Sequence, residues 1–366
     1  MISIHPHRSF FKLLAEPFRR QSSRTVVIRA YRGFGSTHEI CLFGRIFRQP
    51  ERSGRSARDD LLGDLANIWR WIRRRGMRYA EVEARFGLAR KRARTDRHGF
   101  FFIRLPIQDP PDSNRIWQQA HLKLAGPGGG GSGTAADVFI APRSAAFGMI
   151  SDIDDTVVYT GVANRIKMLW RLFFSTAQSR VAFAGVAAFY RALHRGGSGG
   201  QSNPMLYVSR APWSIYDVMD AFFNLHDIPA GPVLFLRYWG MTIDHPLPRR
   251  ARDHKLALIR QALDLYRDLP FILIGDSGQK DPEVYARIVR ENPGRILAIY
   301  IRDVGSAPGR RRSIAKLAQA VAPTGTTLLL AADSAAMAEH AVRQGFITSD
   351  AATQVRSALR AGMGKT

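Results

Sequence analysis

The sequence predicts an α/β protein with a doubly wound parallel sheet in its second half and an N-terminal β-rich, sandwich-like domain. Three observations support this: short apolar runs before residue 141, strand and helix patterns that alternate after residue 147, and the length of the chain. A chain of 366 residues exceeds what one hydrophobic core usually organises. We therefore expect two domains, or one large domain with extensions.

The first half carries short apolar runs separated by turn residues, a pattern typical of strands. We expect strands at 25–31, 39–47, 99–105 and 119–124, and one helix at 61–73, where apolar side chains share a face. A basic leader covers 1–24, and the glycine run 126–133 is a flexible connection or a long hairpin tip. The predicted β-rich domain is therefore 25–144.

The second half alternates short buried strands with helices, which indicates a parallel sheet covered on both faces. The expected strands are 148–152, 205–209, 233–237, 271–275, 295–301 and 326–331, and the expected helices lie near 213–226, 253–267, 281–291 and 332–344. A catalytic domain is predicted over 145–345, followed by a C-terminal helix or tail at 346–366. In such sheets the ligand lies at the carboxyl ends of the strands.

Charge and cysteine content narrow the partners and the compartment. The net charge of +24 comes mostly from arginine spread through both halves. It favours polyanions such as nucleic acid, anionic lipid headgroups or phosphorylated substrates, although compositional bias explains it equally well. The single cysteine, Cys41, excludes an intrachain disulfide or a cysteine-based zinc site, and a buried structural thiol is expected.

No apolar run approaches the roughly 20 residues that cross a bilayer, and the N-terminus does not resemble a signal peptide. We expect a cytoplasmic protein, either soluble or bound peripherally to a membrane. Residues 165–174 combine aromatic and basic side chains that suit a lipid interface, or form a helix packed on the core. The leader either binds lipid or is a disordered basic tail.

Acidic residues follow the first strand of the second half. Asp152 and Asp154 are two residues apart, so in an extended chain their carboxylates project to the same side. Two converging carboxylates repel each other unless a cation or a shared proton relieves them. Magnesium prefers oxygen ligands and is commonly held by one or two carboxylates together with a substrate phosphate.

Further polar residues follow the other strands and meet the first pair at one sheet edge. We expect Asp276 to be a direct or water-mediated metal ligand with Asp281 as its support, and Ser209 and Lys255 to bind a phosphoryl group. Alternatively, Ser209 is a turn residue and Lys255 pairs with Asp253 on a solvated face. The acids after the first strand, Ser209, Lys255 and the acids at 276 and 281 occur in this order along the chain. Together they outweigh these separate alternatives.

This ordered set resembles the haloacid dehalogenase superfamily of phosphohydrolases, with Asp-x-Asp-x-Thr at 152–156 and Gly-Asp-Ser-x-x-x-Asp at 275–281. The resemblance implies that Asp152 is the nucleophile and Asp154 the general acid and base. It also implies that Mg²⁺ is held by Asp152, the Asp154 backbone carbonyl and Asp276. The chemistry is consistent, since an aspartyl-phosphate splits one difficult displacement into two easier ones.

The segments around the motifs are more specific. Six sequence segments resemble the catalytic domain of the actin-patch-protein type phosphatidate phosphatases. They are 147–156, 186–193, 206–213, 253–255, 274–285 and 299–304. The resemblance implies hydrolysis of phosphatidate to diacylglycerol and phosphate. One departure is Arg210 after Ser209, which either binds phosphate or points outward.

The expected partner is a phospholipid substrate at a membrane surface with anionic lipid, and no specific nucleic acid. Short spacings between the motifs leave no room for a large lid, and an open site suits a lipid or another bulky phosphoester. One alternative is a phosphatase of the same mechanism acting on a soluble or protein phosphomonoester. Another alternative is a non-catalytic scaffold that binds polyanions. The presence of Asp152, Asp154 and Asp276 argues against it.

Overall fold

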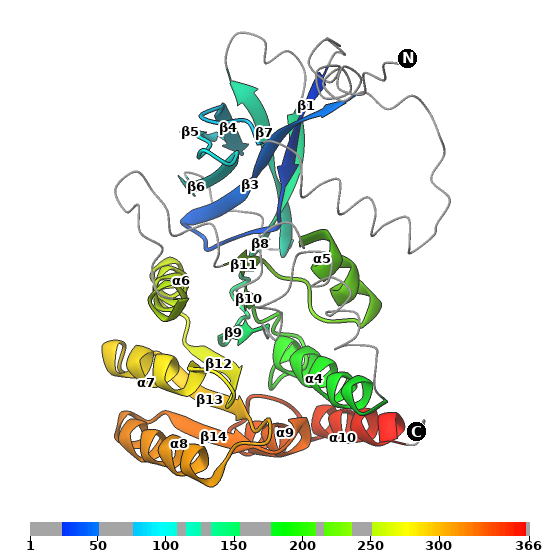
Figure 1. Ribbon diagram of the computed structural model, residues 1–366, viewed down its shortest axis with the longest axis vertical. Coiled ribbons are helices and arrows are strands. Elements are labelled where there is room, and N and C mark those ends of the chain that lie inside the picture. The colour runs from blue at the N-terminus through cyan, green and yellow to red at the C-terminus, as the bar shows by residue number, and fades with distance from the viewer. Residues whose placement is uncertain are drawn as a thin grey trace, which may run out of the picture.

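The computed structural model describes residues 24–50, 76–107, 115–125, 133–153, 177–209, 216–235 and 251–363. Two sheets lie one above the other in Figure 1, a β-rich sheet (sheet A) and a sheet flanked by helices (sheet B). Several predicted features lie outside the described residues: most of the leader and of the glycine run, the helix at 61–73, the segment 165–174, Asp154 and Arg210.

Sheet A has eight described strands and confirms a β-rich first half. They are β1 (Arg24–Ala30), β2 (Gly33–Gly35), β3 (Glu39–Pro50), β4 (Glu81–Phe86), β5 (Ala89–Arg94), β6 (Phe100–Pro106), β7 (Trp117–Ala125) and β8 (Gly133–Ile140). Their order is β1-β3-β2-β8-β7-β4-β5, with β6 paired to β3. Buried side chains alternate along the strands, as at Phe101, Ile103 and Leu105 of β6.

The strands of sheet A form one hydrogen-bonded sheet rather than the two separate sheets of a sandwich. The reason is β3, whose 12 residues pair with β1 near its end and with both β2 and β6 near its start. This long strand therefore joins β1, β2 and β6 in one hydrogen-bonding network. The sheet surrounds its own apolar core, which includes Leu42, Val82 and Val138.

Sheet B confirms the predicted parallel, doubly wound arrangement. Its strands are β9 (Gly148–Asp152), β10 (Met205–Ser209), β11 (Val233–Phe235), β12 (Phe271–Asp276), β13 (Ile296–Arg302) and β14 (Thr327–Ala331). They are all parallel, in the order β11-β10-β9-β12-β13-β14. The strand order reverses direction between β9 and β12, so a crevice is expected beyond their carboxyl ends.

Seven described helices accompany sheet B. They are α4 (Ala177–Arg195), α5 (Tyr216–Leu225), α6 (Ala251–Leu265), α7 (Asp281–Glu291), α8 (Pro308–Val321), α9 (Ser334–Arg343) and α10 (Ser349–Met363). Four of them match the expected helices closely, and α10 lies in the C-terminal segment, where a helix or a tail was expected. None of the described helices is long and apolar enough to cross a bilayer.

The two sheets share an apolar contact. Tyr31, Phe34, Cys41 and Phe43 of the first half belong to the same buried cluster as the strands and helices of sheet B. Burial raises the pKa of the Cys41 thiol to about 12, so the expected buried thiol is confirmed. The first half therefore packs directly on the second.

Polar contacts accompany this packing at α5. The Tyr31 and Tyr216 rings are 4.4 Å apart between centroids. The backbone N–H of Arg32 donates to the Tyr216 hydroxyl at 2.9 Å, and the Arg32 guanidinium pairs with Asp220. These contacts define the position of α5 relative to sheet A.

Phe34 provides a test of this contact, because its ring is 3% exposed and lies 6.4 Å from the Tyr266 ring between centroids. We expect Phe34→Ala to lower the free energy of unfolding by about 3–5 kcal/mol, through lost burial and a new cavity. Leu88→Ala is the control, since Leu88 is 74% exposed and its loss should change stability by less than about 0.5 kcal/mol. Urea unfolding measures both, and equal stabilities would contradict the shared core.

Candidate active site

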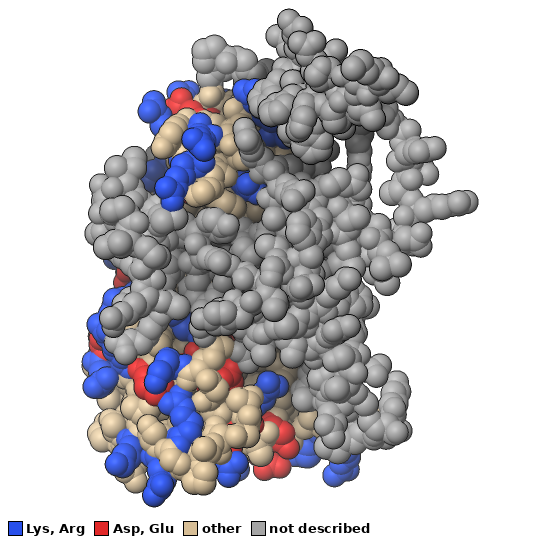
Figure 2. All heavy atoms as spheres, viewed as in Figure 1, with Lys and Arg blue, Asp and Glu red and all other residues tan. Residues whose placement is uncertain are grey.

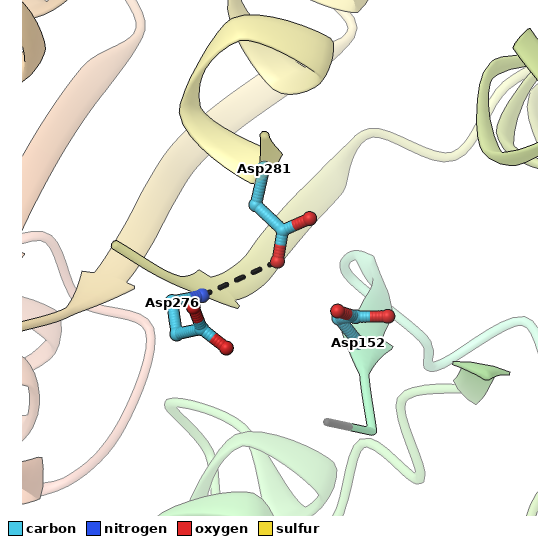
Figure 3. A group of neighbouring side chains, drawn as sticks. All are labelled: Asp152, Asp276 and Asp281. Atoms are coloured by element: carbon cyan, nitrogen blue, oxygen red, sulfur yellow. Dashed lines mark hydrogen bonds between the residues drawn. The ribbon is translucent and has the colours of Figure 1, made fainter. Parts of the chain in front are cut away.

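Three carboxylates meet at the carboxyl ends of β9 and β12. The two strands are parallel neighbours, with Ile274 aligned to Ser151, so Asp152 and Asp276 end at the same edge. One oxygen each of Asp152, Asp276 and Asp281 lies within 4.8 Å of the others. Figure 3 shows the three carboxylates around one space. The predicted convergence of these acids is therefore observed.

Asp281 reaches the strand end because Gly275 has no side chain. A Cβ at Gly275 would lie 2.3 Å from Asp281 Oδ2, too close for any other residue. The same oxygen accepts a hydrogen bond from the Asp276 backbone N–H at 3.3 Å. The Tyr285 hydroxyl donates to the Ile274 carbonyl at 2.9 Å and ties α7 to β12. The Gly-Asp pair and the start of α7 thus form one unit.

Asp276 is held by the turn that follows it. Its Oδ1 accepts backbone hydrogen bonds from Gly278 at 2.7 Å and from Gln279 at 3.1 Å. Such local bonds from a backbone turn to a carboxylate restrict the rotamer of the side chain. The carboxylate of Asp276 is therefore oriented before any ligand binds.

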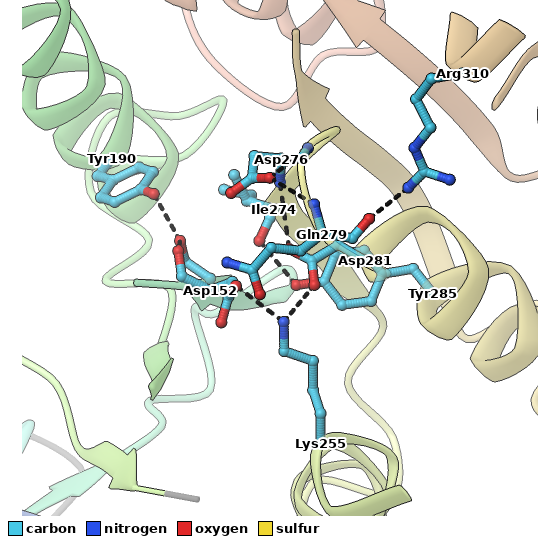
Figure 4. Close-up of polar contacts among 11 residues, drawn as sticks. Asp152, Tyr190, Lys255, Ile274, Asp276, Gln279, Asp281, Tyr285 and Arg310 are labelled. Atoms are coloured by element: carbon cyan, nitrogen blue, oxygen red, sulfur yellow. Dashed lines mark hydrogen bonds and ion pairs between the residues drawn. The ribbon is translucent and has the colours of Figure 1, made fainter. Parts of the chain in front are cut away.

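Lys255 brings a positive charge into the cluster from α6. Its ammonium lies 2.9 Å from Asp152 Oδ2 and also pairs with Asp281, as Figure 4 shows. Burial disfavours the charged ammonium, but the attraction of Asp152 and Asp281 outweighs it and raises the Lys255 pKa. The lysine is only 4% exposed, so the alternative of a solvated surface pair is wrong.

The charges of this cluster fit a divalent cation. Within this cluster of described residues, three carboxylates face one ammonium, an excess of two negative charges when all four groups are ionised. Mg²⁺ prefers oxygen ligands and is commonly held by one or two carboxylates together with waters and a substrate phosphate. The donor set therefore fits the cation that the sequence predicted.

Ser209 lies on the strand beside Asp152. Its strand β10 pairs with β9, with Val208 aligned to Asp152, and the Val208 carbonyl accepts from the Ile153 N–H at 2.8 Å. Ser209 is 3% exposed. It ends β10 at the sheet edge where the acids meet, as predicted for a phosphate-binding hydroxyl.

Several supporting residues were not predicted. The Tyr190 hydroxyl of α4 lies 2.6 Å from Ser151 Oγ, directly before Asp152. Arg310 of α8 donates to the Ser277 carbonyl at 2.9 Å and to the Gln279 carbonyl, and it pairs with Glu283. The basic run at 310–312 is visible in the sequence, but nothing there links it to the turn after Asp276.

Lys255 gives a prediction about stability. Lys255→Met should lower the free energy of unfolding at pH 7 by about 3–5 kcal/mol, because it leaves buried carboxylates without their cation. A lysine whose folded pKa exceeds the ordinary value of 10.5 stabilises below pH 10.5 and loses this effect above it. The difference between wild type and variant should therefore narrow above pH 10.5.

Lys316→Met of the exposed α8 surface is the control, with an expected change below about 0.5 kcal/mol. Guanidinium unfolding followed by circular dichroism measures both variants. Equal stability of Lys255→Met and wild type would show that the lysine does not compensate the acids.

Known proteins resemble the segment that carries this cluster. Residues 147–303 match the family model described as the catalytic domain of phosphatidate phosphatase APP1. Phosphatidate phosphatase APP1 of Saccharomyces cerevisiae is 34% identical over 156 residues, which cover 42% of this chain and 25% of that protein. An uncharacterized protein of Schizosaccharomyces pombe is 30% identical over 161 residues, covering 43% of this chain and 25% of that protein.

The chain thus matches about a quarter of the length of these curated relatives. Among solved structures, a carbohydrate acetylesterase from Xanthomonas citri aligns with 82% of this chain and 75% of its own at 12% identity, with a TM-score of 0.24 that is too low to indicate a common fold. The predicted resemblance to the phosphatidate phosphatase APP1 catalytic domain is confirmed for residues 147–303, the segment that holds the whole cluster of acids and lysine.

Proposed function

We propose that this protein is a phosphoric monoester hydrolase that converts phosphatidate to diacylglycerol and phosphate. The observation that carries the proposal is the buried Asp152 carboxylate, paired with Lys255 and adjacent to Asp276 and Asp281, within the segment that matches phosphatidate phosphatase APP1. The proposal includes a haloacid dehalogenase-like, Rossmannoid fold. The order of the parallel strands and the acids at the ends of β9 and β12 support it.

In the proposed first step, an Asp152 carboxylate oxygen attacks the phosphorus of the monoester. A bond forms between this oxygen and phosphorus, the bond to the glycerol oxygen breaks, and diacylglycerol leaves with a proton. The product on the protein is an aspartyl-phosphate. Asp154 is proposed as the donor of that proton, on the strength of its place in the sequence motif.

In the second step, water attacks the same phosphorus and loses a proton to Asp154. The bond between phosphorus and the Asp152 oxygen breaks, inorganic phosphate leaves and the carboxylate is restored. Lys255 remains charged throughout, because its raised pKa lies well above neutral pH. We propose that its ammonium binds phosphoryl oxygens as negative charge accumulates there. Ser209 and Arg210 are proposed as further phosphate ligands.

We propose that Asp152, Asp276 and the Asp154 backbone carbonyl hold a Mg²⁺ ion, with Asp281 as support. The ion would neutralise phosphate charge beside the nucleophile. Asp281 suits a supporting role because its carboxylate contacts both Lys255 and the Asp276 backbone. The turn bonds to Asp276 Oδ1 hold that carboxylate in position.

The proposed substrate is a lipid, presented at an anionic membrane surface to which the protein binds peripherally. The match to phosphatidate phosphatase APP1 supports this choice. The site chemistry itself suits any phosphomonoester, so a panel of phosphatidate micelles and soluble phosphomonoesters tests the leaving group. Preference for a soluble member by orders of magnitude would replace the lipid in the proposal and leave the mechanism intact.

The nucleophile is tested with Asp152→Asn. We expect kcat for phosphate release from phosphatidate in mixed micelles to fall by roughly 10⁴-fold or more, since an amide oxygen is a poor nucleophile. Asp303→Asn is the matched control, because Asp303 also follows a strand of sheet B. Its carboxylate is engaged elsewhere, since it accepts from the Ser306 N–H at 2.8 Å and pairs with Arg311. Its kcat should stay within about threefold of wild type. Equal rates of Asp152→Asn and wild type would refute the proposal.

The metal site is tested by magnesium binding without turnover. Asp276→Asn should weaken Mg²⁺ binding by about tenfold or more, because one charged ligand becomes neutral. Calorimetric titration of the free protein measures this, and the rise in melting temperature with added Mg²⁺ should shrink in parallel. Unchanged affinity in Asp276→Asn, beside an unaffected Asp303→Asn control, would remove Asp276 from the site.

A further inference from the structure

The β4–β5 hairpin of sheet A presents an apolar residue at its tip. Phe86 pairs with Ala89, so Gly87 and Leu88 form a two-residue turn. Gly87 has φ +56°, which matches the type II′ turn with glycine in the first central position. This geometry projects Leu88 into solvent, where it is 74% exposed. The exposed leucine adds an apolar side chain to the tip of a hairpin whose second strand is rich in charge.

The charged side chains of the hairpin differ between its base and its tip. Farther from the tip, Arg92 faces Glu83 across the strands at 2.9 Å, and Lys123 of β7 pairs with the same carboxylate at 2.8 Å. Next to the tip, Arg85 faces Arg90 instead. Neither of these two arginines has an acidic partner within the described part of the chain. Within the described residues, Arg85 and Arg90 therefore place two positive charges without an acidic partner beside Leu88.

A shallow groove lies beside the two arginines. His121 of β7 is aligned with Arg85, and small residues of β8, including Ala135, follow on the next strand. These side chains border a groove of about 310 Å³, whose far end carries the paired Glu83 and Lys123. Figure 2 shows blue Lys and Arg side chains over the region where β4 and β5 lie. Since like charges directly opposite each other destabilise a sheet, a bound anion would stabilise this row.

We propose that this hairpin docks on the surface of an anionic lipid bilayer. Leu88 enters the interfacial region, and Arg85 and Arg90 bind the phosphate groups of lipid headgroups on either side of it. Apolar tips flanked by basic residues suit this boundary because it offers acyl chains and negative charge together. Charges on an edge strand also prevent pairing with other sheets, but that function does not require an exposed leucine.

A bilayer fits this surface better than nucleic acid. Binding of nucleic acid strands relies on aromatic stacking in addition to charge, whereas the exposed tip residue is aliphatic. The inference concerns a surface of sheet A that is separate from Asp152 and its partners. It is tested by binding alone, so its failure and the failure of the proposed phosphatase activity are distinguishable.

The experiment uses the full chain and sedimentation with vesicles of phosphatidylcholine, alone or with 30 mol% phosphatidylglycerol. Wild type should bind the anionic vesicles and bind phosphatidylcholine far more weakly. Arg85→Gln/Arg90→Gln should reduce partitioning about 25-fold, at about fivefold for each arginine at a charged surface. Leu88→Ser should reduce it about fivefold without a change of charge.

Arg312→Gln/Lys316→Gln is the matched control, since it removes two charges from the exposed surface of α8. It should leave vesicle binding within about twofold of wild type. An equal loss in this control would show that net charge, and not the hairpin, binds the vesicles and would overturn the inference. Unchanged binding of the hairpin variants would do the same.

A short single-stranded oligonucleotide, measured by fluorescence anisotropy, tests the rival polyanion. If the double arginine variant loses oligonucleotide binding but retains vesicle binding, the surface binds nucleic acid and the inference is wrong. Thermal melting checks that each variant folds. If the double variant is unfolded, Leu88→Ser tests the inference by itself. Reduced vesicle binding supports the inference, and unchanged binding overturns it.

Discussion

The ion pairs of Lys255 are the constraint on which the site depends. The doubly wound sheet directs two strand ends to one point, and each ends in an acid, so Asp152 and Asp276 approach each other with Asp281 close by. Without a cation this arrangement would oppose folding. The ammonium from α6 supplies one positive charge in the absence of any ligand. The absence of a side chain at Gly275 lets Asp281 approach the strand end, where it pairs with the same ammonium.

Support for the site comes from elements on both sides of sheet B. Tyr190 of α4 contacts Ser151 before the first acid, while Arg310 of α8 holds the turn after the second. Backbone N–H groups of that turn hold Asp276 itself. The chain segments that carry Asp152 and Asp276 are therefore held by contacts outside the cluster of charges, as a preorganised site requires.

Much of sheet B and the core of the site was predictable, because each depends on local pattern. Buried strands such as β9 and β10 are continuous apolar runs, and acids that follow parallel strands must meet at one edge. The contacts of Tyr190 and Arg310 were not predictable, since they join residues far apart in the sequence through packing. Strand β5 was missed because its sequence, ARKRAR, is charged at four of six positions. Helix α8 was missed because it buries few side chains.

The shared apolar contact between the two sheets has a consequence for synthesis of the chain. Arg32 and its partner Tyr216 are 184 residues apart, and translation at about 5–20 residues per second separates their appearance by on the order of ten seconds or more. During that interval the nascent sheet A presents Tyr31, Phe34 and Phe43 without the helices that cover them. The apolar face of sheet A is therefore completed only late in translation, when Tyr216 and Tyr266 reach Tyr31 and Phe34.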